Sequence, residues 1–595
     1  MIDLYHSNFP TTRQWLYTLT ILLALSVNAI TGQKIQAQSR PNVLIMITDD
    51  QGYGDVSFHG NPYLKTPHIE SLAESGVEMT HFFAYPNCAP TRAGLMTGRY
   101  PYRTGVVSVT QVDHLMNTSE VTLAEILSDN GYRTGIFGKW HLGDNCPMRP
   151  TDQGFQEALV HRGGGIGQYA GPPGNSYFNP ILEHNNVSTK YEGYCDDIFT
   201  DAALDFISKK DKKPFFAYLA TNLPHLPLQV PDEKAEPYRK MGLHEDNALV
   251  YGMIANIDSN VGRVLDRLKA LGIEENTIVI FLSDNGPRHK RTKNDVYPSR
   301  WVANLRGTKT SVYECGIRVP FIVRWPEKLS SGKQVDTMGA VIDILPTILD
   351  ACNIPPSENI RIDGKSLLPL WEGKPTDFKD REIITQVHYG AAVFKYMHFA
   401  VRTQKYKLVS PHDDPHHILY QPTDEELRKT LARLELYDIE KDPSERINLA
   451  RKHPEIVEDL LARYEDWFDE VTQERDSKGI QRIYLGTAAQ PEVILSRYDW
   501  GGPRVISKNQ LGYWRVQTEP GLYEISLDLP RLSSNGIAHI KYQDVHLTLP
   551  VQKNQKTVLF SNVNLPGGTG NFQAFLKIER LASGPLFVHV KRLDL

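Results

Sequence analysis

The chain has 595 residues, more than one ordinary domain contains, so two or three domains are expected. Hydrophobic residues make up 41% and charged residues 23%, a composition that is ordinary for a globular protein. The formal net charge of −5 argues against a general nucleic-acid-binding protein, so any attraction for an anionic ligand must be local.

The chain begins with a segment typical of a secretory signal peptide. An apolar run from Trp15 to Val27 follows Arg13 and leads into small and polar residues. A membrane-spanning helix usually needs about 20 apolar residues, more than this run provides. We therefore expect residues 1–37 to be removed from an exported protein, periplasmic or else secreted, that has no stable membrane anchor. An uncleaved anchor is the alternative.

Three apolar runs without alternation are typical of strands buried on both faces of a mostly parallel sheet. They cover residues 42–48, 215–220 and 277–282, and helical patterns lie between them, the clearest over 246–270. Strands that alternate with helices predict an α/β sandwich, in which ligands bind at the carboxyl ends of the strands.

Two of these strands are followed directly by oxygen-bearing side chains. Asp49 and Asp50 follow the first strand, and Asp284 and Asn285 follow another. Ligands of this kind favour a hard cation, and flexible carboxylate and amide ligands suit Ca²⁺ better than Mg²⁺. Turns also favour Asp and Asn, so the dipeptides alone are a weak signal.

A single cysteine, Cys88, is placed where a helix is expected to begin. Pro90 and Thr91 suit the first helical positions, and Gly98 can end the segment. The side chain at position 88 would then face bare backbone N–H groups, with Arg92 one turn away. Both features lower a cysteine pKa, so a thiolate nucleophile is one interpretation and a buried structural cysteine is another.

The segment Cys88–Gly98, C-A-P-T-R-A-G-L-M-T-G, resembles the maturation motif of the formylglycine sulfatases, C-x-P-[ST]-R with a small-residue and glycine ending. Gly131–His141 is similar to the second signature of that family, and the resemblance covers residues 41–475. It implies an alkaline-phosphatase-like sandwich and the oxidation of Cys88 to formylglycine (3-oxoalanine) by a formylglycine-generating enzyme. It also implies one Ca²⁺ ion, bound by Asp49, Asp50, Cys88, Asp284 and Asn285.

The same resemblance implies hydrolysis of sulfate monoesters and a role for each of five further side chains. The hydrated aldehyde at position 88 would attack sulfur with support from Arg92, while Lys139 would hold a sulfate oxygen. His225 and Lys309 would assist the departing alcohol, and His141 would then act as the base that restores the aldehyde.

A basic cluster follows the predicted metal residues and consists of Arg288, His289, Lys290 and Arg291. A second candidate is His161, which begins a glycine-rich loop whose backbone could approach a ligand closely. In a chain of negative net charge, the cluster suits an anionic polymer, although a solvated loop is an equal alternative. We expect a sulfated polysaccharide or its oligosaccharides as substrate. A phosphonate monoester or phosphodiester hydrolase is the alternative enzyme, and a carbohydrate-binding protein with an inactive site is the third hypothesis.

The pattern changes after the catalytic domain, which we expect over residues 38–378. Short alternating strands and a helix over about 454–472 predict a smaller α+β subdomain at 379–485. Residues 486–595 contain short β runs separated by turn residues, which predicts an additional β-sandwich-like module. Core packing is expected, rather than sugar stacking, for its aromatic residues Trp500, Tyr513, Trp514 and Tyr523.

The five cysteines are too few for disulfides to be the main support of an exported chain. With Cys88 assigned to chemistry, Cys146 and Cys195 form the first pair to test. Unpaired buried thiols are the alternative for these two and for Cys315 and Cys352.

Overall fold

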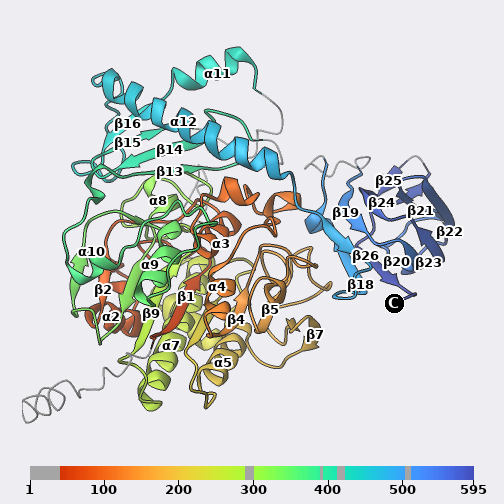
Figure 1. Cartoon of the computed structure of the whole chain (residues 1–595), viewed down its shortest axis with the longest axis horizontal. Coiled ribbons are helices and arrows are strands. Elements are labelled where there is room, and N and C mark those ends of the chain that lie inside the picture. Colours follow the sequence, from red (N-terminus) through yellow and green to blue (C-terminus); the bar gives the residue numbers. More distant parts are fainter. Residues whose placement is uncertain (1–39, 289–299, 389–392, 412–421, 503–510, 580) are drawn as a thin grey trace, which may run out of the picture. The chain divides into compact units, whose positions relative to one another are not determined.

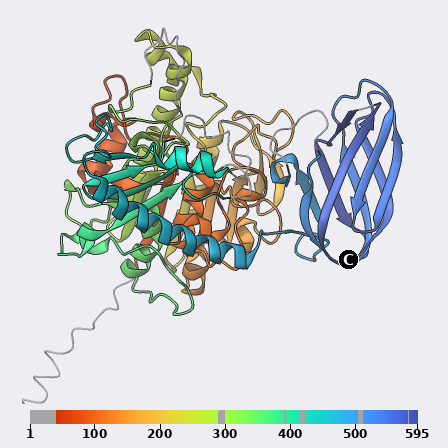
Figure 2. The same ribbon diagram turned by 90° about the horizontal axis from the view of Figure 1, so that it is seen from above.

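The computed structural model describes residues 40–288, 300–388, 393–411, 422–502, 511–579 and 581–595. Residues 42–595 form one unit, whose largest sheet has ten strands (Figures 1 and 2). In spatial order, the strands are β11 (Lys333–Val335), β2 (Val77–Met79), β10 (Phe321–Arg324), β9 (Thr277–Ser283), β1 (Asn42–Thr48), β8 (Phe215–Ala220), β4 (Arg133–Lys139), β5 (Glu157–His161), β6 (Ile181–His184) and β7 (Val187–Lys190). The expected signal segment lies outside the described residues.

The five central strands, β9, β1, β8, β4 and β5, run parallel to one another. β10 is antiparallel to both of its neighbours, and β6 and β7 continue the sheet as an antiparallel edge. β1 is buried along nearly all of its length, as its continuous apolar run predicts. The predicted α/β sandwich with a mostly parallel sheet is confirmed.

Helices cover both faces of this sheet, because alternate β1 side chains point into two different cores. Val43 and Ile47 lie in a core with α3 (Cys88–Thr97), α4 (Leu123–Asp129), α9 (Ile344–Ala351) and α10 (Leu368–Glu372). Leu44 and Met46 lie in the other core with α2 (Pro67–Glu74), α5 (Cys195–Ile207) and α7 (Glu245–Ala270). This part also contains α6 (Asp232–Lys240), α8 (Glu314–Ile317), β3 (Phe82–Phe83) and β12 (Gly339–Ala340). The helix expected over 246–270 is therefore confirmed as α7.

A second, antiparallel sheet follows in the chain. Its strands are β13 (Glu382–Gln386), β14 (Phe399–Thr403), β15 (Tyr406–Val409) and β16 (Glu435–Asp438), accompanied by α11 (Asp424–Leu431) and α12 (Pro454–Lys478). Tyr464 and Phe468 of α12 pack on this sheet, together with Tyr102 of the α/β sandwich. We call the α/β sandwich, which is formed by the ten-stranded sheet and the helices that cover it, the large sandwich. The α+β character of the subdomain is as predicted, but α12 continues to Lys478, beyond the expected end at 472.

The last part of the chain forms two sheets around one core, and Figure 2 shows their long strands in blue. One sheet contains β17 (Ile483–Leu485), β19 (Trp514–Thr518), β24 (Gly568–Ile578), β21 (Gly536–Tyr542), β22 (Val545–Val551) and β25 (Leu581–Ser583). The other contains β18 (Glu492–Ser496), β26 (Phe587–Arg592), β20 (Gly521–Asp528) and β23 (Thr557–Leu565). Neighbouring strands are antiparallel, except that β17 and β19 run parallel. We call this part the C-terminal module. Its first strand precedes the expected boundary at residue 486 because β17 pairs with β19. Trp500, Trp514 and Tyr523 are buried in its core, as expected.

All five cysteines are buried, and the thiols of Cys88, Cys146 and Cys195 are free. Cys146 and Cys195 are therefore not paired, and the alternative of unpaired thiols is confirmed for them. They lie in different surroundings: the Cys195 thiol is 3.5 Å from Asn222 Oδ1, whereas Cys146 Sγ accepts a hydrogen bond from Thr487. None of the helices in the described part of the chain combines the length and the apolar character needed to cross a membrane.

Candidate active site

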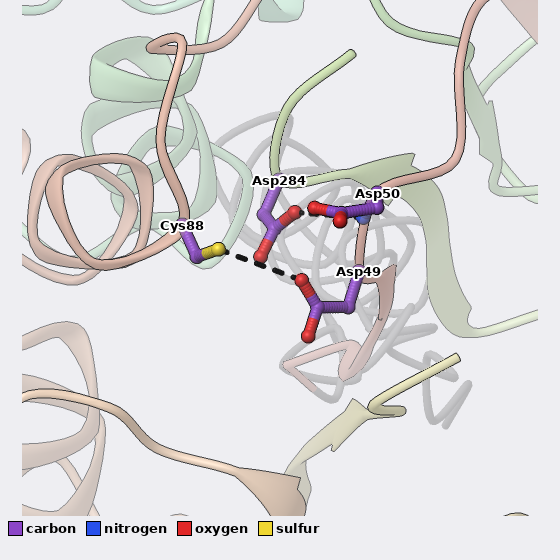
Figure 3. Close-up of side chains that lie close together, drawn as sticks. All are labelled: Asp49, Asp50, Cys88 and Asp284. Atoms are coloured by element: carbon purple, nitrogen blue, oxygen red, sulfur yellow. Dashed lines mark hydrogen bonds between the residues drawn. The ribbon is translucent and has the colours of Figure 1, made fainter. Parts of the chain in front are cut away.

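β1 and β9 bring the predicted metal residues to one edge of the sheet. The two strands are parallel neighbours and pair up to Thr48 and Ser283, so the residues that follow each strand emerge side by side. The Asp50 amide donates to Asp284 Oδ1 at 3.2 Å. Figure 3 shows the carboxylates of these two residues and of Asp49 gathered at this point. All are buried in the protein.

Cys88 is the first residue of α3 and points into the same cluster (Figure 3). Its Sγ atom lies 3.5 Å from Asp49 Oδ1 and accepts a hydrogen bond from Lys309 Nζ at 3.0 Å. One ligand atom from each of Asp49, Asp50, Cys88 and Asp284 lies within 4.8 Å of the others. The structure thus brings together four of the five residues expected at the metal, and Asn285 adjoins them through a bond to Asp50.

Each carboxylate of the cluster is paired with one basic side chain. Lys139 Nζ lies 2.7 Å from Asp49 Oδ2, and Lys309 Nζ is bonded to Asp50 Oδ1. Arg92 donates to Asp284 Oδ2 at 2.8 and 3.1 Å, and also to the Lys139 carbonyl at 2.9 Å. Buried charges need such partners, because an unpaired buried charge is strongly destabilising.

Asn285 supplies the observation that tests whether a cation fits here. Its amide nitrogen donates to Asp50 Oδ1 and to the Gly286 carbonyl, both at 2.8 Å. Its Oδ1 atom is buried and has no hydrogen-bond partner among the described residues. An amide oxygen left over beside three carboxylates is the donor set that a hard cation prefers, so these residues fit Ca²⁺.

The environment of Cys88 does not favour a thiolate. Burial raises the pKa of its thiol to about 12, although the charges of Lys139 and Lys309 act to lower it. A thiol with this pKa is protonated at neutral pH. The interpretation of Cys88 as a simple thiolate nucleophile is therefore disfavoured.

His141 lies two residues after the end of β4 and is buried. Its Nε2 atom lies 2.9 Å from the Val109 carbonyl oxygen and 2.6 Å from the Tyr498 hydroxyl. Burial, together with the charge of Lys139, holds the pKa of His141 well below its usual range, so the ring is neutral. Sequence reasoning missed Tyr498, because no motif or periodicity links residues that are 357 positions apart.

His225 lies after β8, near the same cluster. Its Nδ1 atom is 2.7 Å from the Leu226 carbonyl oxygen. Burial and the positive charge of Lys309 lower the pKa of His225, and the nearby Asp50 acts in the opposite direction. The segment Asn222–His225 is thereby joined to the cluster, since the Asp49 amide also donates to the Leu223 carbonyl at 2.8 Å.

The residues expected at the substrate are placed less closely together. His161 ends β5 beside Lys139, and its Nδ1 atom contacts the Arg162 carbonyl at 3.1 Å. Arg288 is exposed, and its carbonyl accepts from Arg300. His289, Lys290 and Arg291 lie outside the described residues. The glycine-rich loop after His161 was expected to approach a ligand, but in the structure Gly164 lies close to a protein side chain. A Cβ atom on Gly164 would lie 2.4 Å from Tyr498 Oη.

Comparison with known proteins places these features in context. Residues 41–354 match the family model for sulfatases, and residues 308–470 match the model described as N-sulphoglucosamine sulphohydrolase, C-terminal. The chain is 30% identical to the N-acetylgalactosamine-6-O-sulfatase of Bacteroides thetaiotaomicron, over 74% of this chain and 97% of that relative. It is 31% identical to the N-acetylgalactosamine-6-sulfatase of Homo sapiens, over 57% of this chain and 68% of that relative.

The crystal structure of Ps i-CgsB in complex with k-i-k-neocarrahexaose resembles this chain with a TM-score of 0.61 at 28% identity. The match covers 72% of this chain and 93% of that one. Both family models end by residue 470, so the C-terminal module lies outside them.

Proposed function

Since this chain belongs to the sulfatase family and is a sulfuric ester hydrolase, we propose that it removes sulfate from a sulfated carbohydrate by means of formylglycine and Ca²⁺. The observation that carries the proposal is the buried cluster of Cys88 with Asp49, Asp50 and Asp284. The formylglycine would be made from Cys88 by a formylglycine-generating enzyme. We also propose that the chain is exported, to the periplasm or the medium.

The proposed groups add two chemical properties to the site. Formylglycine supplies an oxygen nucleophile through its hydrate, and Ca²⁺ neutralises charge on the sulfate oxygens. Asp49, Asp50, Asp284, Asn285 and residue 88 would hold the cation. Arg92 keeps Asp284 in place through two hydrogen bonds. It lies in α3, one turn after residue 88. We propose that this contact also orients the nucleophile.

The lysines have N–H groups to offer to the substrate. Lys139 and Lys309 each use part of their donor capacity on a carboxylate of the cluster, and an ammonium group has three donors. We propose that Lys139 binds a sulfate oxygen and that Lys309 protonates the leaving oxygen.

The two histidines differ in which ring nitrogen is available. The contact of His225 Nδ1 with a carbonyl oxygen requires a proton on Nδ1, so Nε2 of His225 must gain a proton before it can assist Lys309. His141 would accept a proton at Nδ1.

The substrate class rests on the relatives and on charge. One relative is named N-acetylgalactosamine-6-O-sulfatase, and the structure of another was solved in complex with k-i-k-neocarrahexaose. We propose a sulfated polysaccharide or its oligosaccharides, with Arg288 and the basic residues after it as a subsite for further anionic groups. We also propose that His161, the last residue of β5, contacts the substrate.

Replacement of Cys88 tests the nucleophile. Cys88→Ala is expected to abolish hydrolysis of 4-nitrophenyl sulfate and to leave the melting temperature nearly unchanged. Cys352→Ala, a buried cysteine in α9's C-terminal cap, is the matched control and should stay active. Peptide mass spectrometry of active enzyme should find the aldehyde at position 88; active enzyme with only a thiol there would refute the mechanism.

A second measurement compares the rates on 4-nitrophenyl sulfate and on 4-nitrophenyl phosphate esters. A faster reaction with the phosphate esters would favour the alternative function, a phosphonate monoester or phosphodiester hydrolase.

A further inference from the structure

The short helical turn η7 (Arg497–Asp499) belongs to the C-terminal module. It follows β18, whose last residue, Ser496, accepts a hydrogen bond from the Trp514 indole at 2.7 Å. Arg497 Nε donates to a backbone carbonyl before β26, also at 2.7 Å. Both contacts lie within the module, so the module determines where this turn is held.

Tyr498 of this turn reaches the active site. Its hydroxyl lies 2.6 Å from His141 Nε2 and 2.6 Å from the Val109 carbonyl oxygen, while Nε2 lies 2.9 Å from the same carbonyl. Gly164 closes the third side, since a Cβ atom there would lie 2.4 Å from Tyr498 Oη and 2.9 Å from His141 Nε2. A glycine is therefore required for this contact.

The three polar atoms permit one favourable order of protons. A carbonyl oxygen only accepts, and a tyrosine hydroxyl has a single proton, which is directed at Val109. His141 Nε2 must then carry a proton and donate it to the phenol and carbonyl oxygens. The opposite order would place a lone pair of Nε2 against the carbonyl oxygen. His141 Nδ1 is consequently the bare nitrogen, and it is buried with no hydrogen-bond partner among the described residues.

We propose that Tyr498 is a positioning residue of the active site: it fixes His141 in the Nε2–H tautomer and leaves Nδ1 free to accept a proton. The inference rests on the proposed function for the role of His141 as base. The C-terminal module, which lies outside both family models, thereby completes the active site. A second contact supports the placement, because Asp499 Oδ1 lies 3.3 Å from the buried ring of His114.

The first test measures the tautomer itself, on protein that keeps an unmodified Cys88. Nitrogen-15 NMR of the histidine rings, with the His141 signals assigned by their loss in His141→Gln, should show the Nε2–H form in wild type. In Tyr498→Phe, the Nε2 signal should shift and the Nδ1–H form should gain population. A wild-type His141 in the Nδ1–H form would overturn the proposal.

The second test is kinetic, on the matured enzyme. Loss of a hydrogen-bond partner that orients a metal-bound histidine typically costs about 10- to 100-fold in activity. We expect Tyr498→Phe to lower kcat by a factor of this order, with little change in KM or melting temperature. Gly164→Ala should lower kcat as well, because its Cβ displaces the hydroxyl. Gly171→Ala is the matched control, since its Cβ would meet only Asn175, at 3.8 Å.

The outcomes separate the two proposals. An active wild-type enzyme whose kcat and His141 signals are unchanged by Tyr498→Phe would refute the role of Tyr498 alone. A wild-type protein without sulfatase activity would refute the proposed function, and the ring measurement would still decide how Tyr498 acts on His141.

Discussion

Asn285 is the residue whose bonding most directly reports on a cation. Its amide oxygen is buried without a partner among the described residues, and such a group costs about 1–3 kcal/mol in the folded state. A bound cation would remove this cost and would also balance the neighbouring carboxylates. The residue therefore links metal binding to stability.

We expect Ca²⁺ to raise the melting temperature of protein pretreated with a chelator. A ligand at 100 times its Kd stabilises the folded state by about 2.7 kcal/mol. Asn285→Ala should reduce this gain by weakening binding, whereas Asn359→Ala, at an exposed position, should keep it. Thermal unfolding at several Ca²⁺ concentrations measures both effects. A wild-type melting temperature that ignores Ca²⁺ would contradict the metal proposal.

The positions of Asp49 and Asp284 could be predicted from the sequence because parallel strands deliver the residues that follow them to the same edge of a sheet. The start of α3 at Cys88 followed from local helix signals. The partners of His141 could not be predicted in this way. Tyr498 comes from another part of the fold, and only tertiary packing brings its hydroxyl to the ring.

At the scale of elements, α12 differs most from expectation. Its apolar stripe ends near Val471, yet the helix continues to Lys478. The extra turns are charged and bind the large sandwich: Glu474 pairs with Arg103, and Lys478 pairs with Glu120. Hydrophobic periodicity does not register a helix end that is stabilised by ion pairs, so the sequence signal stopped early.

His388 joins β13 to the large sandwich, since its Nδ1 atom lies 2.6 Å from the hydroxyl of Tyr102 in η2 (Pro101–Thr104). Its Nε2 atom accepts from the Phe394 amide at 2.8 Å. Burial and the charge of Arg475 lower the pKa of His388 from 6.5 to about 3. The unfolded chain thus takes up this proton at a higher pH than the folded protein does.

Stability contributed by His388 is therefore complete above pH 6.5 and is lost as the pH falls towards 3. The free energy of unfolding should decrease by up to about 1.4 kcal/mol per pH unit in this window from this residue alone. His388→Gln should show a shallower decrease, because it removes the proton uptake. Urea unfolding of both proteins between pH 7 and pH 4 measures the slopes; parallel curves would contradict the assignment.

At the scale of the whole molecule, the C-terminal module shares its core with the large sandwich. Leu115 and Met148 belong to the same buried cluster as Val493 and Trp514. Backbone contacts add to this, since the Tyr484 amide donates to the Cys146 carbonyl at 3.1 Å. The sequence predicted a separate module, because alternation and turn residues report on strands and carry no information about which outside residues complete a core.

Met148→Ala should weaken this shared core. Truncation of a buried Met typically costs about 2–5 kcal/mol, and here the loss falls where the two parts meet. Calorimetry should show a lower first transition and a separation of the module's unfolding from that of the sandwich. Met241→Ala, at a side chain that is 51% exposed, should change stability by less than about 0.5 kcal/mol. Identical calorimetric traces for the two variants would show that the shared core does not couple the parts.

The central position of β1 determines the order in which the chain can fold during synthesis. Of the described strands, β1 is the first to leave the ribosome, yet its two neighbours are β8 and β9, so its pairing is complete only once residue 283 exists. Pairings between such distant segments form slowly, and the apolar strand stays uncovered in the meantime. While the first half of the protein is being made, the nascent chain therefore carries an unpaired apolar strand, which makes it prone to aggregation.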